Sequence, residues 1–213
     1  MFRRSLSVIV ILLFLSPMSY AADKKEGEEL LKECRPKIKM IAILPFKDLT
    51  ENSGANEEAR AAIYKGLSEI DPVKTGVQIQ PLEETDKELA SLGITGYSGL
   101  AGIPVKKLGE ALHVDAVIIG KVTTYYSPTK DDRFINAILG GTILGHNRAR
   151  AVVETVMRLY YCPEEKEIWY KVLCGDSKPL AFNIEALATN MKSALDTLSD
   201  HMAGCWPYRK RKP

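Results

Sequence analysis

The side chains best suited to acid–base, nucleophilic or metal chemistry lie far apart in this sequence. Its three histidines have neither a nucleophile nor a metal-ligand partner beside them: His113, His146 and His201. The adjacent carboxylates Glu57-Glu58 and Glu83-Glu84 fall in the first turns of expected helices, where the helix dipole favours negative charge. Because Gly140-Gly141 is not followed by Lys and then Ser or Thr, a phosphate-binding loop is not indicated. We therefore predict a non-enzymatic protein without catalytic, cofactor-binding or metal-binding residues.

The sequence also contains four cysteines: Cys34, Cys162, Cys174 and Cys205. None forms a Cys-x-x-Cys pair, so a zinc site is not indicated. In an exported chain an even number of cysteines is compatible with disulfide bonds, and four cysteines leave three connectivities open.

The first 21 residues have the composition of a secretory signal peptide. Arg3 and Arg4 form a basic start, residues 8–15 are an unbroken apolar run, and small residues precede a cleavage point after Ala21. The apolar run is shorter than the ~20 residues that cross a bilayer as a helix. We predict cleavage after Ala21 and export of the mature chain, with an uncleaved anchor as the alternative.

The mature chain has a balanced charge. The whole sequence carries a formal net charge of +2, which the removal of Arg3 and Arg4 reduces to zero. Nucleic-acid-binding proteins normally show a strong basic excess, so we predict no nucleic-acid partner. The basic run over 209–212 is the exception. This run is either a solvated tail or a tail that is weakly attracted to anionic lipid headgroups, by about 1 kcal/mol per charge near the surface.

Hydrophobic patterns predict the elements that must position these residues. Residues 38–46 are expected to be a central strand, because 41–44 are apolar without a break, as in strands covered on both faces. Asn56 is expected to cap a helix whose buried face includes Ala59, Ile63 and Gly66. The later elements, in order, are a short strand over 77–80, a helix over 82–93, a loop over 94–103, a helix from Pro104, a strand over 114–126, a hairpin over 149–174, and an amphipathic helix over 183–202 that ends at Gly204.

The hairpin pattern also predicts a register. Pairing Cys162 with Glu167 places the apolar residues of both strands on one face. The pairs that follow are Tyr161–Ile168, Leu159–Tyr170, Met157–Val172 and Thr155–Cys174. Cys162 and Cys174 then lie on opposite faces of the sheet, so we expect no bond between these two cysteines.

The resulting order, β-α-β-α-α-β-β-β-α, predicts an α/β fold with a single mixed β-sheet flanked by helices. The expected segments are a signal peptide over 1–21, a charged lead-in over 22–37, the folded domain over 38–203 and a basic tail over 204–213. A long apolar insertion, 127–148, separates two strands.

Several stretches resemble the CsgG-like superfamily of the curli secretion channel, the amino-terminal domain of TolB, PelC, LpoB and related bacterial lipoproteins. They are IAILPFKDLTENSG, YKGLSEI, LEETDKELASLGI and IPVKKLGEALHVDAVIIGKVTTY. In the last, Leu108-Gly109 precedes Val114-Asp115-Ala116 and an apolar strand with Gly120, which is the family pattern. The likeness covers residues 38–198. It implies the mixed α/β fold and a periplasmic or outer-membrane-associated location, and it says little about function.

The sequence departs from the family in two respects. Members are often lipidated at an amino-terminal cysteine, and no cysteine lies near position 22. The secretion channel has two membrane-inserting hairpins, whereas this chain offers one candidate, so a full pore subunit is not expected.

The insertion lies where the resemblance places the channel's first membrane hairpin. Its candidate interaction residues are apolar or glycine: Phe134, Ile135, Ile138, Leu139, Gly140, Gly141, Ile143 and Leu144. Two interpretations stay open. The loop contacts a membrane, a neighbouring subunit or a partner, or it folds back and buries Phe134, Ile138 and Leu144 against its own domain.

Together these expectations describe a scaffold or accessory subunit of an outer-membrane secretion or assembly system. It would act through protein partners in the cell envelope, as a homo-oligomer, with peripheral outer-membrane contact. The alternative is a regulatory binding module that activates a periplasmic envelope enzyme.

Overall fold

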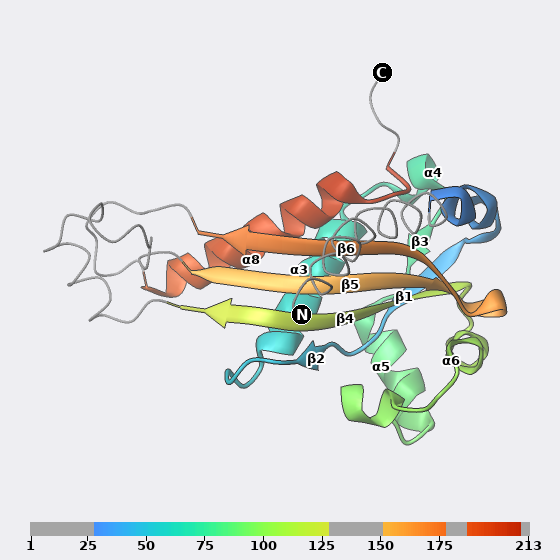
Figure 1. The fold of residues 1–213 in the computed structure, drawn as a ribbon, viewed down its shortest axis with the longest axis horizontal. Coiled ribbons are helices and arrows are strands. Elements are labelled where there is room, and N and C mark those ends of the chain that lie inside the picture. The colour runs from blue at the N-terminus through green and yellow to red at the C-terminus, as the bar shows by residue number, and fades with distance from the viewer. Residues whose placement is uncertain (1–27, 128–150, 178–186, 210–213) are drawn as a thin grey trace, which may run out of the picture.

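The computed structural model describes residues 28–127, 151–177 and 187–209, which build one mixed sheet (Figure 1). The strands are β1 (Met40–Ile43), β2 (Lys47–Asp48), β3 (Gln78–Ile79), β4 (Ala116–Tyr126), β5 (Val152–Tyr161) and β6 (Lys166–Asp176). Their order across the sheet is β3-β1-β4-β5-β6, and β2 pairs with β4 beside this path. Strand β1 pairs in parallel with β3 and with β4, and β2 pairs in parallel with β4, whereas β5 pairs antiparallel with β4 and β6. The predicted mixed sheet flanked by helices is confirmed.

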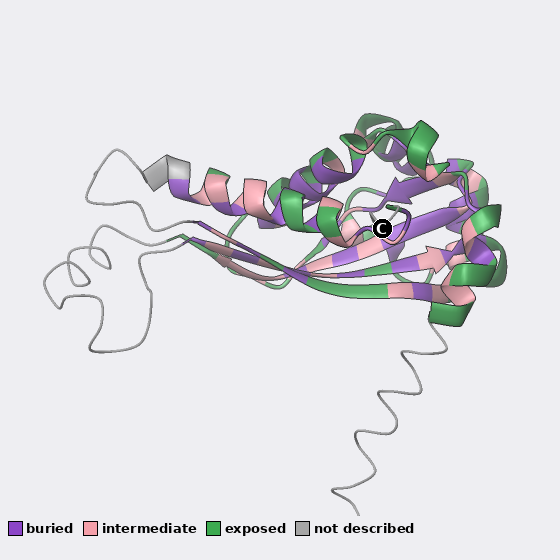
Figure 2. Ribbon diagram, turned by 90° about the horizontal axis from the view of Figure 1, so that it is seen from above, coloured by how far each residue is buried: buried purple, intermediate pink, exposed green. Residues whose placement is uncertain are grey.

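Helices cover the two faces of the sheet unequally. The helices are α3 (Ala55–Ser68), α4 (Pro72–Thr75), α5 (Leu82–Ser91), α6 (Val105–Leu112) and α8 (Leu187–Cys205), with short 3-10 turns η1 (Arg35–Lys37), η2 (Tyr97–Leu100) and η3 (Cys162–Glu164). Helices α3 and α8 pack against each other and against β4 and β6 on one face. On the other face α5 and α6 contact β1, β4 and η3 (Figures 1 and 2).

The unbroken apolar run at 41–44 is the centre of the core, as predicted. All four of its residues are fully buried, and they divide between two clusters. Ile41 and Ile43 pack with α3 and α8, whereas Ala42 and Leu44 pack with α5 and α6. A strand that lies between two neighbouring strands and is covered by helices on both faces has no solvent-exposed face, so polar and apolar residues do not alternate along it.

The start of α3 differs from the prediction. Asn56 was expected to be the N-cap, but the cap is Gly54, which adopts a left-handed conformation with φ 88°. The helix therefore begins before Asn56, whose side-chain Nδ2 instead donates to the Phe46 carbonyl at 3.4 Å. The prediction was wrong because the turn before the helix needs a positive φ, which glycine adopts without steric cost.

The predicted hairpin register is also wrong. Tyr161 pairs with Lys166, and a bulge at Ile168 then shifts the ladder so that Leu159 pairs with Trp169. From there Met157 faces Lys171, Arg158 faces Tyr170 and Val156 faces Val172. Because a shift of one residue turns every side chain to the other face, Tyr170 and Val172 lie away from the core.

The cysteine argument that rested on this register loses its basis. Cys162 is buried in η3 beside α6, whereas Cys174 pairs with Glu154 near the other end of the hairpin. Eight residues of strand β5 separate the two positions, about 27 Å at the strand rise. These two thiols are kept apart by their distance along the strand, and not by lying on opposite faces of the sheet.

Both ends of the predicted domain extend further than expected. Helix α8 continues through Gly204 to Cys205, and Trp206 and Tyr208 are buried, so residues 204–208 do not belong to a solvated tail. Arg35 of the lead-in donates from Nη2 to the Tyr208 carbonyl at 3.0 Å, and its guanidinium lies over the Tyr208 ring. The lead-in is helical over 28–34 and buries Cys34 completely. The lead-in and residues 204–208 thus pack together.

Candidate interaction surface

Part of the sheet carries no helix in the described residues. Strand alternation and the observed registers place one set of β4–β6 side chains on the side opposite α3 and α8. We name this set the open face. Its residues are Lys121, Thr124, Tyr126, Val152, Glu154, Val156, Arg158, Tyr160, Tyr170, Val172 and Cys174. In Figure 2, α8 follows one side of these strands, and the other side is bare over the half of the sheet away from α6.

The open face exposes large apolar side chains. Tyr170 is 45% exposed, Val172 41% and Tyr126 36%. Tyr170 and Val172 are neighbours on one edge of β6, and Val172 stands beside Val156 across the strand pair. Single exposed apolar residues are normal on proteins, but a contiguous group on one face of a sheet indicates a contact surface.

Polar groups hold the aromatic side chains of this face in place. Arg158 forms an ion pair with Glu167 at 3.2 Å, and its guanidinium lies 5.7 Å from the centre of the Tyr170 ring. The Tyr160 hydroxyl donates to the same Glu167 carboxylate at 3.2 Å. Hydrogen bonding with Tyr160 raises the pKa of Arg158, so the guanidinium stays charged. A fixed arginine beside exposed tyrosine is typical of protein-binding surfaces.

A hollow lies at the carboxyl end of β1, between α3 and α5. It has a volume of about 470 Å³ and includes Phe46, Leu82 and Arg60 among its lining residues. Arg60 is buried and donates to the Ile43 carbonyl at 2.7 and 3.0 Å, and it pairs with Asp86 at 2.8 Å. The donors of Arg60 are therefore turned inward, toward the sheet and α5. Arg60 stabilises the packing of α3 on β1.

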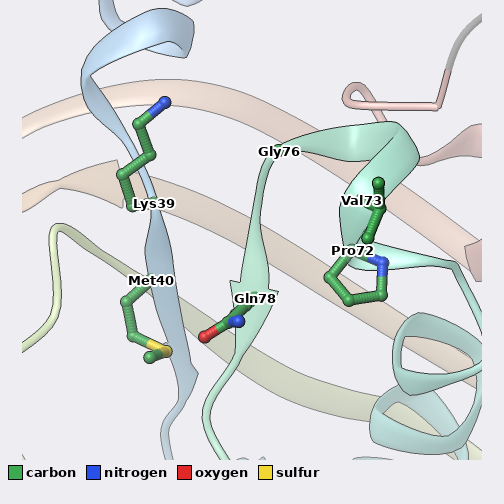
Figure 3. A pocket seen from close by; sticks show the side chains of 6 residues that line it. All are labelled: Lys39, Met40, Pro72, Val73, Gly76 and Gln78. Carbon is green, nitrogen blue, oxygen red and sulfur yellow. The ribbon is translucent and has the colours of Figure 1, made fainter.

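A second hollow, of about 430 Å³, lies between the start of β1 and α4 (Figure 3). In Figure 3 the side chains of Lys39 and Val73 extend in the same general direction and do not meet, and the Gln78 side chain turns toward Met40. Polar groups do not converge here on a common point, as they would in a small-molecule site.

The predicted candidate residues fall into three groups. The insertion residues from Phe134 to Leu144 lie outside the described residues, as does His146, so the interaction loop stays a prediction. His113 ends α6, as expected for a capping position, and Nδ1 of His201 lies 2.7 Å from the Cys174 carbonyl oxygen. The cysteines are free thiols in the structure: Cys34, Cys162, Cys174 and Cys205.

The thiols are poor nucleophiles. Burial raises the pKa of Cys162 to about 12, and it also raises the pKa of Cys34 and of Cys205. Cys174 is exposed at its edge, yet desolvation followed by the charge of Asp176 raises its pKa as well. Because the thiolate is the reactive form, these cysteines are not poised for catalysis at neutral pH.

Among the residues that the structure describes, no three His, Cys, Asp or Glu side chains gather closely enough to hold a metal ion. In the same ranges no helix combines the length and apolar composition that crossing a bilayer requires.

The exposure of the surface residues Tyr170, Lys171 and Val172 was not predicted from the sequence. In the predicted register Tyr170 and Val172 were core partners of Leu159 and Met157, and the bulge at Ile168 reverses this. The one signal that could have found the edge is Lys171, because charged residues in an otherwise apolar strand often mark a free edge.

No protein-family model and no curated protein matches this sequence. Several solved structures are similar to it. The lipoprotein GNA1162 from Neisseria meningitidis is 17% identical, with 76% of this chain and 99% of that chain covered at a TM-score of 0.51. The hypothetical protein CT253 from Chlamydia trachomatis is 10% identical, with 78% of this chain and 94% of that chain covered at a TM-score of 0.48. A PelC dodecamer from Paraburkholderia phytofirmans is 12% identical, with 76% of this chain and 90% of that chain covered at a TM-score of 0.42. The likeness to GNA1162 shows that this chain has a fold found in bacterial lipoproteins.

Proposed function

We propose that this chain is an exported bacterial cell-envelope protein of the CsgG-like superfamily that works by binding other proteins. In this proposal it is a non-enzymatic scaffold or accessory subunit of an outer-membrane secretion or assembly system. The observation that carries the proposal is the open face of β4–β6, where Tyr170 and Val172 are nearly half exposed beside a fixed Arg158.

Three further points support the proposal. The first 21 residues have the composition of a signal peptide. The fold is shared with GNA1162, whose name describes it as a lipoprotein. The thiols have raised pKa values, which fits a binding role better than nucleophilic catalysis. A homo-oligomer and a membrane-contacting insertion remain predictions of the sequence.

In-cell photo-cross-linking tests this proposal. The full chain is expressed in a Gram-negative host with a photo-reactive amino acid at Val172 or, as a control, at Val73. Val73 lies on α4, away from the open face, and is 90% exposed, so it is at least as accessible. We expect the chain in the periplasmic or membrane fraction and a cross-linked product of defined mass from position 172 only. Cytoplasmic retention, or equal products from both positions, would refute the proposal.

A further inference from the structure

We propose that the free edge of β6, from Tyr170 to Val172, binds an extended segment of a partner protein as an added β-strand. This inference rests on the proposed function and specifies the partner's chemistry. Strand β6 is the last in the sheet order, so its outer side has no strand neighbour in the described part of the chain.

The hydrogen-bond pattern shows which β6 residues turn their backbone outward. Just after β6, the Ser177 amide donates to the Ala151 carbonyl at 3.0 Å, so residue 177 faces β5. Backbone direction alternates along a strand, and the register is regular from Trp169 to Asp176. The even-numbered residues from Tyr170 to Asp176 therefore present their N–H and C=O groups to the free edge.

Helix α8 covers one end of this edge and leaves the other open. The Asp176 carbonyl accepts a hydrogen bond from the Thr197 hydroxyl at 3.1 Å, and Nδ1 of His201 lies 2.7 Å from the Cys174 carbonyl oxygen. The outward backbone groups of Tyr170 and Val172 have no backbone partner among the described residues. Proteins usually protect free strand edges, since these groups pair readily with another strand.

Side chains on the two sides of this edge determine what kind of strand fits. On the open face, Tyr170 and Val172 offer exposed apolar surface. On the opposite side Lys171 is exposed, and no ion pair engages it in the described ranges. In strand addition the backbone supplies affinity and alternate side chains supply specificity. The fitting segment has apolar residues beside Tyr170 and Val172 and an acidic residue beside Lys171.

A second copy of this chain fits the edge less well. Antiparallel pairing of two β6 strands through Tyr170 and Val172 sets Lys171 directly opposite the same lysine of the other copy. Like charges directly across a strand pair are destabilising. A register shifted toward Cys174 meets the carbonyl that His201 already occupies. An extended acidic–apolar peptide has neither problem.

Peptide binding to the mature chain tests this site. The probes are acetyl-Thr-Val-Glu-Val-Glu-Val-Thr-amide and the same peptide with Lys in place of both Glu. Binding is measured by NMR titration, and amide hydrogen exchange is followed at Tyr170 and Val172. We expect the Glu peptide to slow exchange at both amides, and the Lys peptide to bind about fivefold more weakly, because it replaces an attraction at Lys171 by a repulsion.

Two variants make the test specific. Val172→Pro deletes an outward N–H and leaves the bonds to β5 intact, because only the odd-numbered residues bond to β5. We expect Val172→Pro to weaken binding of the Glu peptide about tenfold or more. The matched variant Val172→Thr keeps the outward N–H and should bind the peptide as the natural chain does. Lys171→Glu should reverse the preference between the two peptides, which a merely unfolded variant could not do.

Three results would overturn the inference: unchanged binding in Val172→Pro, an unchanged preference in Lys171→Glu, or a free chain that is dimeric with both edge amides already protected. If the peptides fail while position 172 still cross-links in cells, strand addition is wrong and the proposed function stands. If both fail, the proposed function is wrong too.

Discussion

Replacing Gly66 by alanine should destabilise the protein, although it improves helix propensity. Gly66 lies on α3 where that helix crosses α8. A Cβ atom built there would fall on the Ser199 carbonyl oxygen, well inside van der Waals contact, and 3.0 Å from the Ser199 carbonyl carbon. These are backbone atoms, so relief requires a shift of α8 as a whole.

The expected magnitude follows from two opposing effects. Gly→Ala in a helix interior favours folding by about 1 kcal/mol, and overpacking a close contact costs roughly 1–3 kcal/mol. Because the contacted atoms are backbone, we expect the upper part of that range and a net loss of about 2 kcal/mol. For a chain of this size that loss lowers the melting temperature by about 4–8 °C.

Gly204 provides the matched control. It is also helical, in α8, but a Cβ atom there would meet no heavy atom within 4 Å. Gly204→Ala should therefore raise the unfolding free energy by up to about 1 kcal/mol. Urea unfolding of both variants, with m-values compared, gives the measurement. Removing the Ser199 side chain should not rescue Gly66→Ala. A Gly66→Ala variant as stable as the natural chain would refute the close α3–α8 contact.

Three further predictions follow from the core and the charges. The Tyr208 hydroxyl is buried and has no hydrogen-bond partner among the described residues, so Tyr208→Phe should be neutral or stabilising in thermal unfolding. Tyr208→Ala should cost about 3–5 kcal/mol, and equal effects of the two variants would contradict the docking of Tyr208 on the domain. Asp86→Ala leaves the buried Arg60 guanidinium without its carboxylate, so it should lower the unfolding free energy measured in urea by about 2 kcal/mol. The control Asp196→Ala removes an exposed ion pair and should lower the unfolding free energy by less than about 1 kcal/mol. Burial raises the pKa of Cys162 from 9.0 to about 12, so the folded state keeps a proton that the unfolded state loses; stability should decline as the pH rises from 9 toward 12. Cys162→Ala should show a shallower decline, and identical pH profiles would contradict that burial.

Much of the fold was predictable because burial leaves a periodic trace in the sequence. The apolar run at 41–44 predicted a strand covered on both faces, and it is fully buried. The face with Ala59, Ile63 and Gly66 predicted α3 correctly. These features depend on neighbours a few residues apart, which a sequence displays directly.

The candidate surface was not predictable, for a physical reason. Both faces of β6 carry apolar residues, so the alternation fits two registers. The bulge at Ile168 selects between them, and Trp169 just beyond it packs edge-on against Trp206 of the carboxyl-terminal segment. A register error of one residue placed Tyr170 and Val172 in the core.

The sequence by itself determined the long helices and strands of the core, since each buried face repeats at a fixed local period, but not the short elements β2 and α4. It also determined the absence of local catalytic motifs and the apolar character of the insertion. Only the tertiary structure decided which strand lies at the edge, which side of it is wet, and that residues 204–208 pack with the lead-in. The docking of residues 204–208 depends on contacts between residues far apart in the chain, such as Arg35 and Tyr208. The exposed side of β6 depends on a single bulge in the hairpin, and local periodicity contains no information about either.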